Sequence, residues 1–149
     1  MEAVLTGSDR GRTLAAISNA VVRVHARAYG KGPTRANTHL RDGQYVLCLL
    51  RDPFTTGEKT LIAAGRADAV HEHRRAFHQT VEVPLREAVE NLTGCSVVGF
   101  VPGISVESDL ITQLFILKPP RANGSAYSPP YGLDAGLSQT VQPNYEERP

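Results

Sequence analysis

One long amphipathic segment, from about Arg66 to Leu92, limits what this chain can fold into. Its apolar residues recur at steps of seven, four, four, four and three, which predicts a helix with one buried face. Such a face must be covered by a sheet or by other helices. Pro84 is expected to bend the helix, because proline removes a backbone donor, and Gly94 to end it. The apolar positions are Val70, Phe77, Val81, Leu85, Val89 and Leu92.

Shorter helices and strands are predicted on both sides of this helix in the sequence. Apolar residues at three- and four-residue steps predict a helix from Thr13 to Tyr29, which Gly30 ends. Thr55 and Glu58 have the spacing of a capping box, so a short helix is predicted over residues 56–64. Strands are predicted at residues 34–40, 44–50, 95–101 and 109–117, with a turn at 41–43 and a loop at 102–108.

The resulting order, α-β-β-α-α-β-β, predicts an α+β fold. Two hairpins with helices between them favour a four-stranded, mainly antiparallel sheet with the helices packed on one face. The apolar residues of the last two strands do not alternate cleanly, so both faces of the sheet should be covered, and we expect a homodimer. The folded unit is predicted at residues 12–118, after a flexible lead-in at 1–11 and before a proline-rich, disordered or extended tail at 119–149.

Composition excludes several classes of protein. Net charge is +1, no apolar run approaches the ~20 residues of a spanning helix, and Met1 to Arg12 lacks the apolar stretch of a signal peptide. We therefore expect a cytoplasmic chain that does not insert into membranes directly. Cys48 and Cys95 lie in apolar runs and are expected to be free thiols. We find no catalytic set, the histidine spacings do not fit a metal site, and neither an enzyme activity nor a cofactor is expected.

Candidate binding residues are basic and lie mainly in the first third of the chain. Residues 1–51 hold eight basic and three acidic side chains, a balance of +5. The loop Gly30-Lys31-Gly32-Pro33 could cradle an anion, or could be a helix stop followed by a tight turn. Arg74, with Arg75 or His78, could receive a phosphate or carboxylate, or could lie on a solvated helix face. The candidate ligand-binding residues are Arg23, Arg27, Gly30, Lys31, Gly32, Pro33, Arg35, Arg74 and Arg75, with Arg41 as a neighbour.

Several short blocks in the same order resemble the MpsC family. They are ISNAVVR at 17–23, YGKGPT at 29–34, GEKTL at 57–61, GR at 65–66, RRAF at 74–77 and VENLTG at 89–94. The resemblance covers about residues 12–118. It carries over no catalytic residues, and the matching positions to examine are Gly30, Lys31, Gly32, Pro33, Glu58, Arg66, Arg74 and Arg75.

The resemblance implies a link to a membrane-potential-generating system, whose membrane proteins handle sodium ions or, in related forms, inorganic carbon. It points to a non-enzymatic accessory or regulatory component that reaches the membrane peripherally, through a membrane-protein partner. Two alternatives remain from the residues themselves. One is a sensor of a nucleotide or other small anion at the Gly-Lys-Gly-Pro loop. The other is a nucleic-acid-binding domain, which the sequence disfavours because the chain lacks interleaved aromatic residues.

Overall fold

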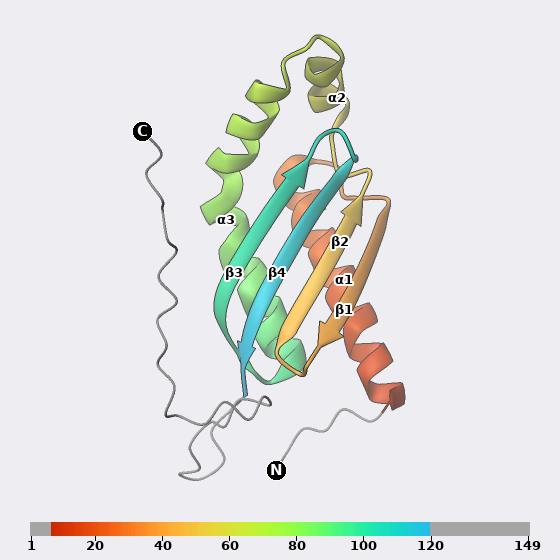
Figure 1. Cartoon of the computed structure of the whole chain (residues 1–149), viewed down its shortest axis with the longest axis vertical. Coiled ribbons are helices and arrows are strands. Elements are labelled where there is room, and N and C mark those ends of the chain that lie inside the picture. Colours follow the sequence, from red (N-terminus) through yellow and green to blue (C-terminus); the bar gives the residue numbers. More distant parts are fainter. Residues whose placement is uncertain (1–6, 120–149) are drawn as a thin grey trace, which may run out of the picture.

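The computed structural model describes residues 7–119 of the chain. Their elements follow the predicted order (Figure 1). The predicted flexible lead-in lies outside the described residues at positions 1–6, and the predicted tail does so at positions 120–149. The elements are α1 (Gly7–Tyr29), β1 (Arg35–Arg41), β2 (Tyr45–Arg51), α2 (Thr56–Ala63), α3 (Ala67–Thr93), β3 (Ser96–Ser105) and β4 (Leu110–Lys118).

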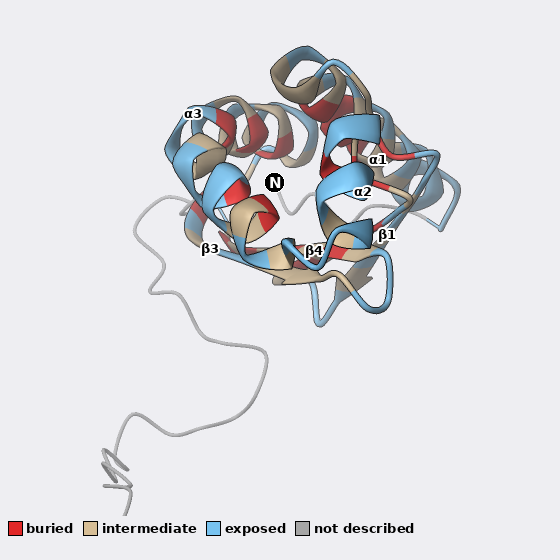
Figure 2. Cartoon of the chain, turned by 90° about the horizontal axis from the view of Figure 1, so that it is seen from above, coloured by how far each residue is buried: buried red, intermediate tan, exposed pale blue. Residues whose placement is uncertain are grey.

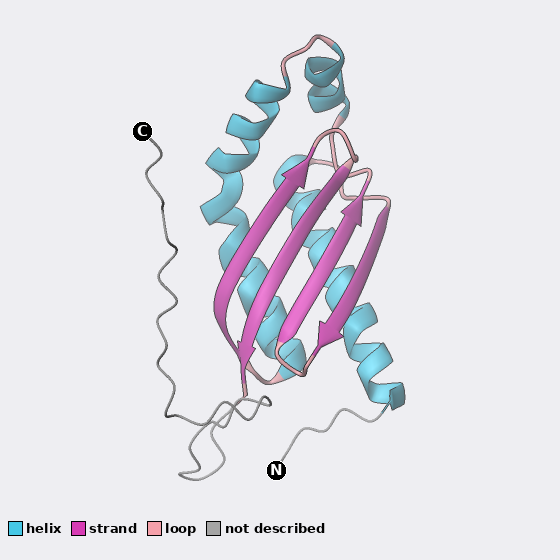
Figure 3. Ribbon diagram, viewed as in Figure 1, coloured by secondary structure: helices cyan, strands magenta, loops and turns pink. Residues whose placement is uncertain are grey.

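The four strands form one antiparallel sheet in the order β1-β2-β4-β3. Each hairpin supplies one central and one edge strand, and the hairpins join where β2 pairs with β4, with Leu47 opposite Leu114. Helices α1 and α3 both lie behind the sheet in the view of Figure 3, and α2 lies near one end of it. The predicted α+β class, with helices on one face of the sheet, is therefore confirmed.

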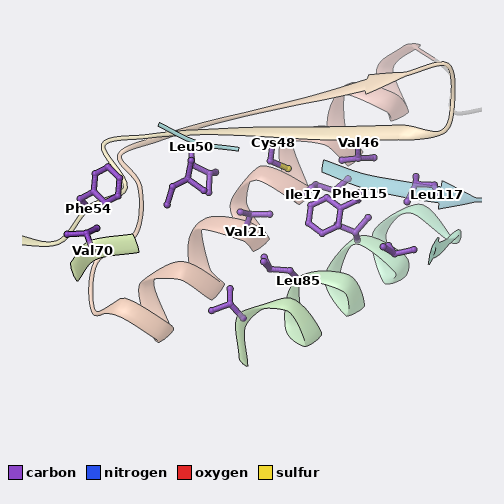
Figure 4. Packing of buried hydrophobic residues seen from close by; sticks show 14 residues of the cluster. Ile17, Val21, Val46, Cys48, Leu50, Phe54, Val70, Leu85, Phe115 and Leu117 are labelled. Atoms are coloured by element: carbon purple, nitrogen blue, oxygen red, sulfur yellow. The ribbon is translucent and has the colours of Figure 1, made fainter. Parts of the chain in front are cut away.

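The core lies between the sheet and the two long helices. Buried faces of the helices point toward the sheet in Figure 2, and Figure 4 shows their side chains meeting those of the central strands. Strands β2 and β4 alternate strictly between buried and half-buried residues up to Leu50 and through Lys118, as expected when one face is covered. The buried residues include Ile17, Val21, Val46, Leu50, Val81, Leu85, Val89, Ile111, Phe115 and Leu117.

Local residue chemistry accounts for the turns and helix ends. Asp42 and Gly43 have positive φ angles of 55° and 65°, as a tight hairpin turn requires. Thr55 and Glu58 form the predicted capping box, in which each side chain satisfies the other's backbone N–H. Gly94, at φ 70°, ends α3 in the left-handed conformation.

The structure differs from the sequence prediction at three places. Helix α1 begins at Gly7 rather than Thr13, so residues 7–11 are helical. Its first turns are exposed and carry no apolar periodicity, which is why the pattern of apolar residues did not predict them. Strand β3 continues to Ser105 through the expected loop, since Pro102 is tolerated on an edge strand. Leu92 is 38% exposed, because the buried row of α3 continues from Val89 at steps of four and misses it.

The face of the sheet that turns away from the helices is also partly apolar. Leu47 and Leu49 on β2 and Leu114 and Ile116 on β4 occupy the alternate positions of the central strands and are half-buried. This pattern explains why the strands looked apolar on both faces in the sequence. The homodimer inferred from that pattern stays a prediction.

Sedimentation velocity tests the homodimer. We expect the full chain, of 16.1 kDa, to sediment at about twice its single-chain mass. Leu47→Lys combined with Leu114→Lys should give the single-chain mass, because two charges on the outer face oppose its burial. Val83→Lys is the control, since Val83 is 58% exposed on α3. A wild-type chain that sediments as a monomer at high micromolar concentration contradicts the prediction.

Candidate functional site

Polar side chains occupy core-facing positions on four different elements and meet inside the molecule. Arg74 lies four residues after Val70 on the buried row of α3, and His25 lies four after Val21 on that of α1. Gln113 stands on the inner face of β4. Their exposed fractions are 4% for Arg74, 3% for His25 and 3% for Gln113, and Glu58 of α2 is 4% exposed. Buried polar groups of this kind need partners or a function.

Arg74 and Glu58 form a buried, two-pronged ion pair. Arg74 Nε donates to Glu58 Oε2 at 2.7 Å, and Nη2 donates to Oε1 at 2.6 Å. Nη2 also donates to the carbonyl of Pro53 at 2.8 Å. Because both carboxylate oxygens are engaged on one edge of the guanidinium, the pair has the parallel geometry typical of strong arginine–carboxylate contacts.

Aromatic rings cover the faces of the Arg74 guanidinium. Its central carbon lies 3.7 Å from the ring centre of Tyr29 and 5.5 Å from that of Phe54. Burial opposes the charged form of Glu58, but the Arg74 guanidinium and the Thr55 backbone N–H outweigh it and lower the pKa of Glu58. The pair is therefore ionised at neutral pH.

His25 and Gln113 form a second buried contact beside this ion pair. His25 Nε2 and Gln113 Nε2 lie 2.7 Å apart. Burial, and then the nearby positive charge of Arg74, lower the pKa of His25 to about 4. The imidazole is therefore neutral at pH 7 and carries a single proton.

The two contacts line one cavity, which we call the polar cavity. It is lined by His25, Tyr29, Arg74, His78 and Gln113 on its polar side, and its volume is about 40 Å³. Three buried atoms of these residues have no hydrogen-bond partner: Arg74 Nη1, His25 Nδ1 and Gln113 Oε1. A cavity of this size and polarity is large enough for more than one water molecule or for a very small polar group.

A wider depression adjoins the polar cavity at the surface, and we call it the outer cleft. Its volume is about 340 Å³, and it shares Arg74, His78, Pro102 and Ile104 with the polar cavity. Exposed Arg75 and half-buried His71 complete its charged or titratable lining. The outer cleft thus connects the buried groups with the surface between α3 and β3.

In the Gly-Lys-Gly-Pro loop, the ammonium group of Lys31 contacts acceptors of the same chain. Lys31 Nζ lies 2.7 Å from the carbonyl oxygen of Asp52, 3.2 Å from that of Phe54 and 3.2 Å from Asp52 Oδ2. These three acceptors match the three donors of an ammonium group. Lys31 therefore ties the loop to the segment that precedes α2.

The other residues of this loop determine its backbone conformation and its packing against α1. Gly30 ends α1 at φ 78°, and its N–H donates to the carbonyl of Ala26. A side chain at Gly32 would place its Cβ 3.0 Å from the backbone oxygen of Val22, so glycine permits the close approach to α1. Pro33 is buried. The alternative interpretation, a helix stop followed by a tight turn, agrees with this geometry.

The remaining predicted arginines form what we call the basic edge: Arg23 and Arg27 of α1 and Arg35 and Arg41 of β1, all exposed. Hydrogen bonds from Arg10 to the carbonyl of Leu40 and between Ser18 and Thr38 fix α1 alongside β1. These contacts hold the N-terminal half of α1 beside β1, whereas His25, which lies between Arg23 and Arg27, contacts Gln113 of β4. The four arginines are therefore exposed but spread over the C-terminal half of α1 and the two ends of β1. Arg74 and Arg75 lie on α3, away from β1, so the nine predicted residues do not form one site.

Sequence reasoning missed two residues of the polar cavity, His25 and Gln113, although it named Arg74. Each is a polar residue at a core-facing position of an otherwise apolar row, His25 on α1 and Gln113 on β4. A polar residue at such a position was the feature that could have identified them. Among residues 7–119, no three histidine, cysteine or acidic side chains are grouped as a metal site requires. Both cysteines are free, and burial raises the pKa of Cys48 to about 11.

Comparison with known proteins connects the chain to a described family. A family model with the description "Na+-translocating membrane potential-generating system (MpsC)" matches residues 9–119. This region contains the polar cavity and the basic edge. No curated protein and no solved structure matches the chain. Within the part of the chain that the structure describes, no helix is both long and apolar enough to cross a membrane.

Single replacements should show how strongly the buried ion pair holds the fold. We expect Arg74→Met or Glu58→Leu alone to lower the free energy of unfolding by about 3–5 kcal/mol, because each leaves a buried partner uncompensated. Arg74→Met combined with Glu58→Leu should cost clearly less than the sum of the two single losses. Urea unfolding followed by circular dichroism measures these values. Additive losses would contradict a coupled pair.

The neutral His25 should make stability depend on pH. In the unfolded chain its pKa is 6.5 and in the folded chain about 4, so the unfolded state binds more protons between these values. Stability should therefore fall by up to about 3 kcal/mol as pH drops from 7 to 4. The lowered pKa of Glu58 adds a further loss below its ordinary value of 4.5. His25→Leu should flatten the curve between pH 7 and 5, and an unchanged slope would contradict this origin.

Proposed function

The chain belongs to the MpsC family, and we propose that it is a non-enzymatic accessory or regulatory component of a Na+-translocating membrane-potential-generating system. The family model covers the region from α1 to β4 and supplies the link to such a system. The observation that carries the accessory role is the basic edge, because it offers an exposed, charged surface to a partner.

Charge is unevenly divided between the two parts of the described chain. Residues 7–51 hold eight basic and two acidic side chains, a balance of +6, whereas residues 52–119 hold six and nine, a balance of −3. The first part comprises α1, β1 and β2, so the excess of positive charge is carried by α1 and the first hairpin. Such a field attracts acidic surfaces and orients the encounter.

The partner that this surface fits is an acidic protein surface of a membrane component of the system. The arginines of the basic edge are exposed, and guanidinium groups recognise carboxylates through paired hydrogen bonds. In this arrangement the chain acts on ion movement by binding to the transporting protein.

The chemistry of the buried residues supports a role without catalysis. The most buried thiol, Cys48, has a pKa raised by burial to about 11, so it is protonated and weakly nucleophilic at neutral pH. Its hydroxyl neighbour, Thr38, bonds to Ser18 at 2.6 Å. The Arg74–Glu58 pair engages both oxygens of the only buried carboxylate among residues 7–119.

Membrane vesicles from cells that lack the gene for this chain provide the test. Purified full chain should sediment with these vesicles and increase Na+-dependent membrane potential. Arg23→Glu with Arg27→Glu and Arg35→Glu should weaken vesicle binding about tenfold or more, because charge repulsion replaces attraction. Added potassium chloride should weaken binding of the unmodified chain as well.

Controls separate a protein partner from other anionic surfaces. Arg66→Glu reverses an exposed charge at the N-terminus of α3, outside the basic edge, and should bind as the unmodified chain does. Equal binding to protein-free vesicles of anionic lipid, or salt-sensitive binding to RNA or DNA in preference to the membranes, contradicts the proposed partner. A membrane potential that does not respond to the chain contradicts the proposed role.

A further inference from the structure

Three side chains that line the polar cavity each have a buried polar atom with no hydrogen-bond partner among residues 7–119. Arg74 Nη1, His25 Nδ1 and Gln113 Oε1 belong to side chains that are each at least nine-tenths buried, and all three side chains line the same cavity. They come from α3, α1 and β4, so they converge through tertiary folding. Leaving a buried polar group unpaired is unfavourable, so three at one place indicate a site for bound water or for a small polar ligand.

The fold uses only one edge of the Arg74 guanidinium. Nε and Nη2 hold Glu58 and the carbonyl of Pro53, whereas Nη1 has no hydrogen-bond partner within residues 7–119 apart from the nearby hydroxyl of Tyr29. The ion pair thus fixes the guanidinium in place and leaves Nη1 as a preorganised donor. Tyr29, stacked on the guanidinium at 3.7 Å, further restricts its movement.

The contact between His25 and Gln113 always leaves one donor and one acceptor unused. If the Gln113 amide donates to His25 Nε2, the ring proton is on Nδ1, and Oε1 remains as the acceptor. If the amide is reversed, Nδ1 becomes the acceptor and the amide N–H₂ the donor. With Arg74 Nη1, the polar cavity therefore offers donors from two side chains and one acceptor.

The lining favours a negative charge. Among residues 7–119, no carboxylate lines the polar cavity or the outer cleft, whereas Arg74 and the exposed Arg75 do. The neighbouring acids are already occupied: Glu58 by Arg74, and Glu82 by Arg86 at 2.8 Å and His78 at 3.3 Å. An anion would approach through the outer cleft, where Arg75 is exposed.

We propose that the polar cavity is the binding site of a small oxyanion that carries a hydroxyl group. The oxyanion accepts hydrogen bonds from Arg74 Nη1 and from the donor of the His25–Gln113 pair, and its hydroxyl donates to the remaining acceptor. The cavity takes this headgroup, and the outer cleft takes the rest of a larger ligand. The site lies on the β3 side of the molecule and does not depend on docking through the basic edge.

Glycolate and acetate form a matched pair of probes, because they differ by one hydroxyl group. Titration calorimetry of the full chain should show saturable binding of glycolate and of phosphate, and at least fivefold weaker binding of acetate. A site that pairs a hydroxyl discriminates against the analogue without it, because its acceptor is then left unpaired. Potassium chloride at the same ionic strength is the control for non-specific salt effects.

Variants and spectra place the ligand. Gln113→Leu should weaken glycolate binding at least tenfold, and Arg75→Gln should weaken it several-fold, whereas Gln79→Leu, on the exposed face of α3, should leave it unchanged. In the unmodified chain, nitrogen-15 signals of the Arg74 and His25 side chains should shift on titration with glycolate. This measurement needs no variant to fold.

Three outcomes would overturn the proposal. They are the absence of saturable binding with any of these probes, glycolate binding that survives Gln113→Leu, and side-chain signals of Arg74 and His25 that stay in place while binding proceeds. Equal affinity for glycolate and acetate overturns the hydroxyl requirement. Each outcome is independent of vesicle binding, so it can be told apart from a failure of the accessory role.

Discussion

The ion pair between Arg74 and Glu58 is the contact on which the arrangement of the helices depends. It connects α3 to α2, and through Pro53 to the segment that follows β2. Tyr29 at the end of α1 stacks on the same guanidinium. A buried ion pair contributes little net stability compared with apolar packing, but it tolerates few alternative geometries. In this fold it holds three helices and a loop in one relative position.

The same pair accounts for the polar cavity beside it. Because Glu58 and Pro53 engage one edge of the guanidinium, the opposite edge is held still and left without a protein partner. His25, kept neutral by burial and by the charge of Arg74, faces the cavity without adding a second buried charge. Rigid placement of unpaired groups is what a binding site requires, and the ion pair supplies it for the guanidinium of Arg74.

Periodicity in the sequence predicted the order of elements, the hairpin turn at Asp42-Gly43 and the capping box of α2, because these features depend on nearby residues. Periodicity did not predict the polar cavity, of which it indicated only Arg74 as a candidate residue. Arg74 lies on the buried row of α3 between Val70 and Phe77, where the apolar pattern skips one position. That skipped position alone does not predict that Arg74 pairs with a buried Glu58 on another helix. Lys31 illustrates the same limit, since its partners at Asp52 and Phe54 come from a distant loop. Local patterns report residue types, whereas a site depends on contacts between remote segments.

The edge strand β3 carries a further consequence in its irregular course. Its register shifts between Val97 and Gly99, which leaves Val98 outside the regular pairing, and Pro102 removes a backbone donor farther along. A bulge and a proline interrupt the row of free amide groups that another strand would need for pairing. At the opposite edge, β1 presents Arg35 and Arg41. Both edges of the sheet therefore disfavour pairing with a strand of another molecule, so copies of this chain are kept from joining into a continuous sheet.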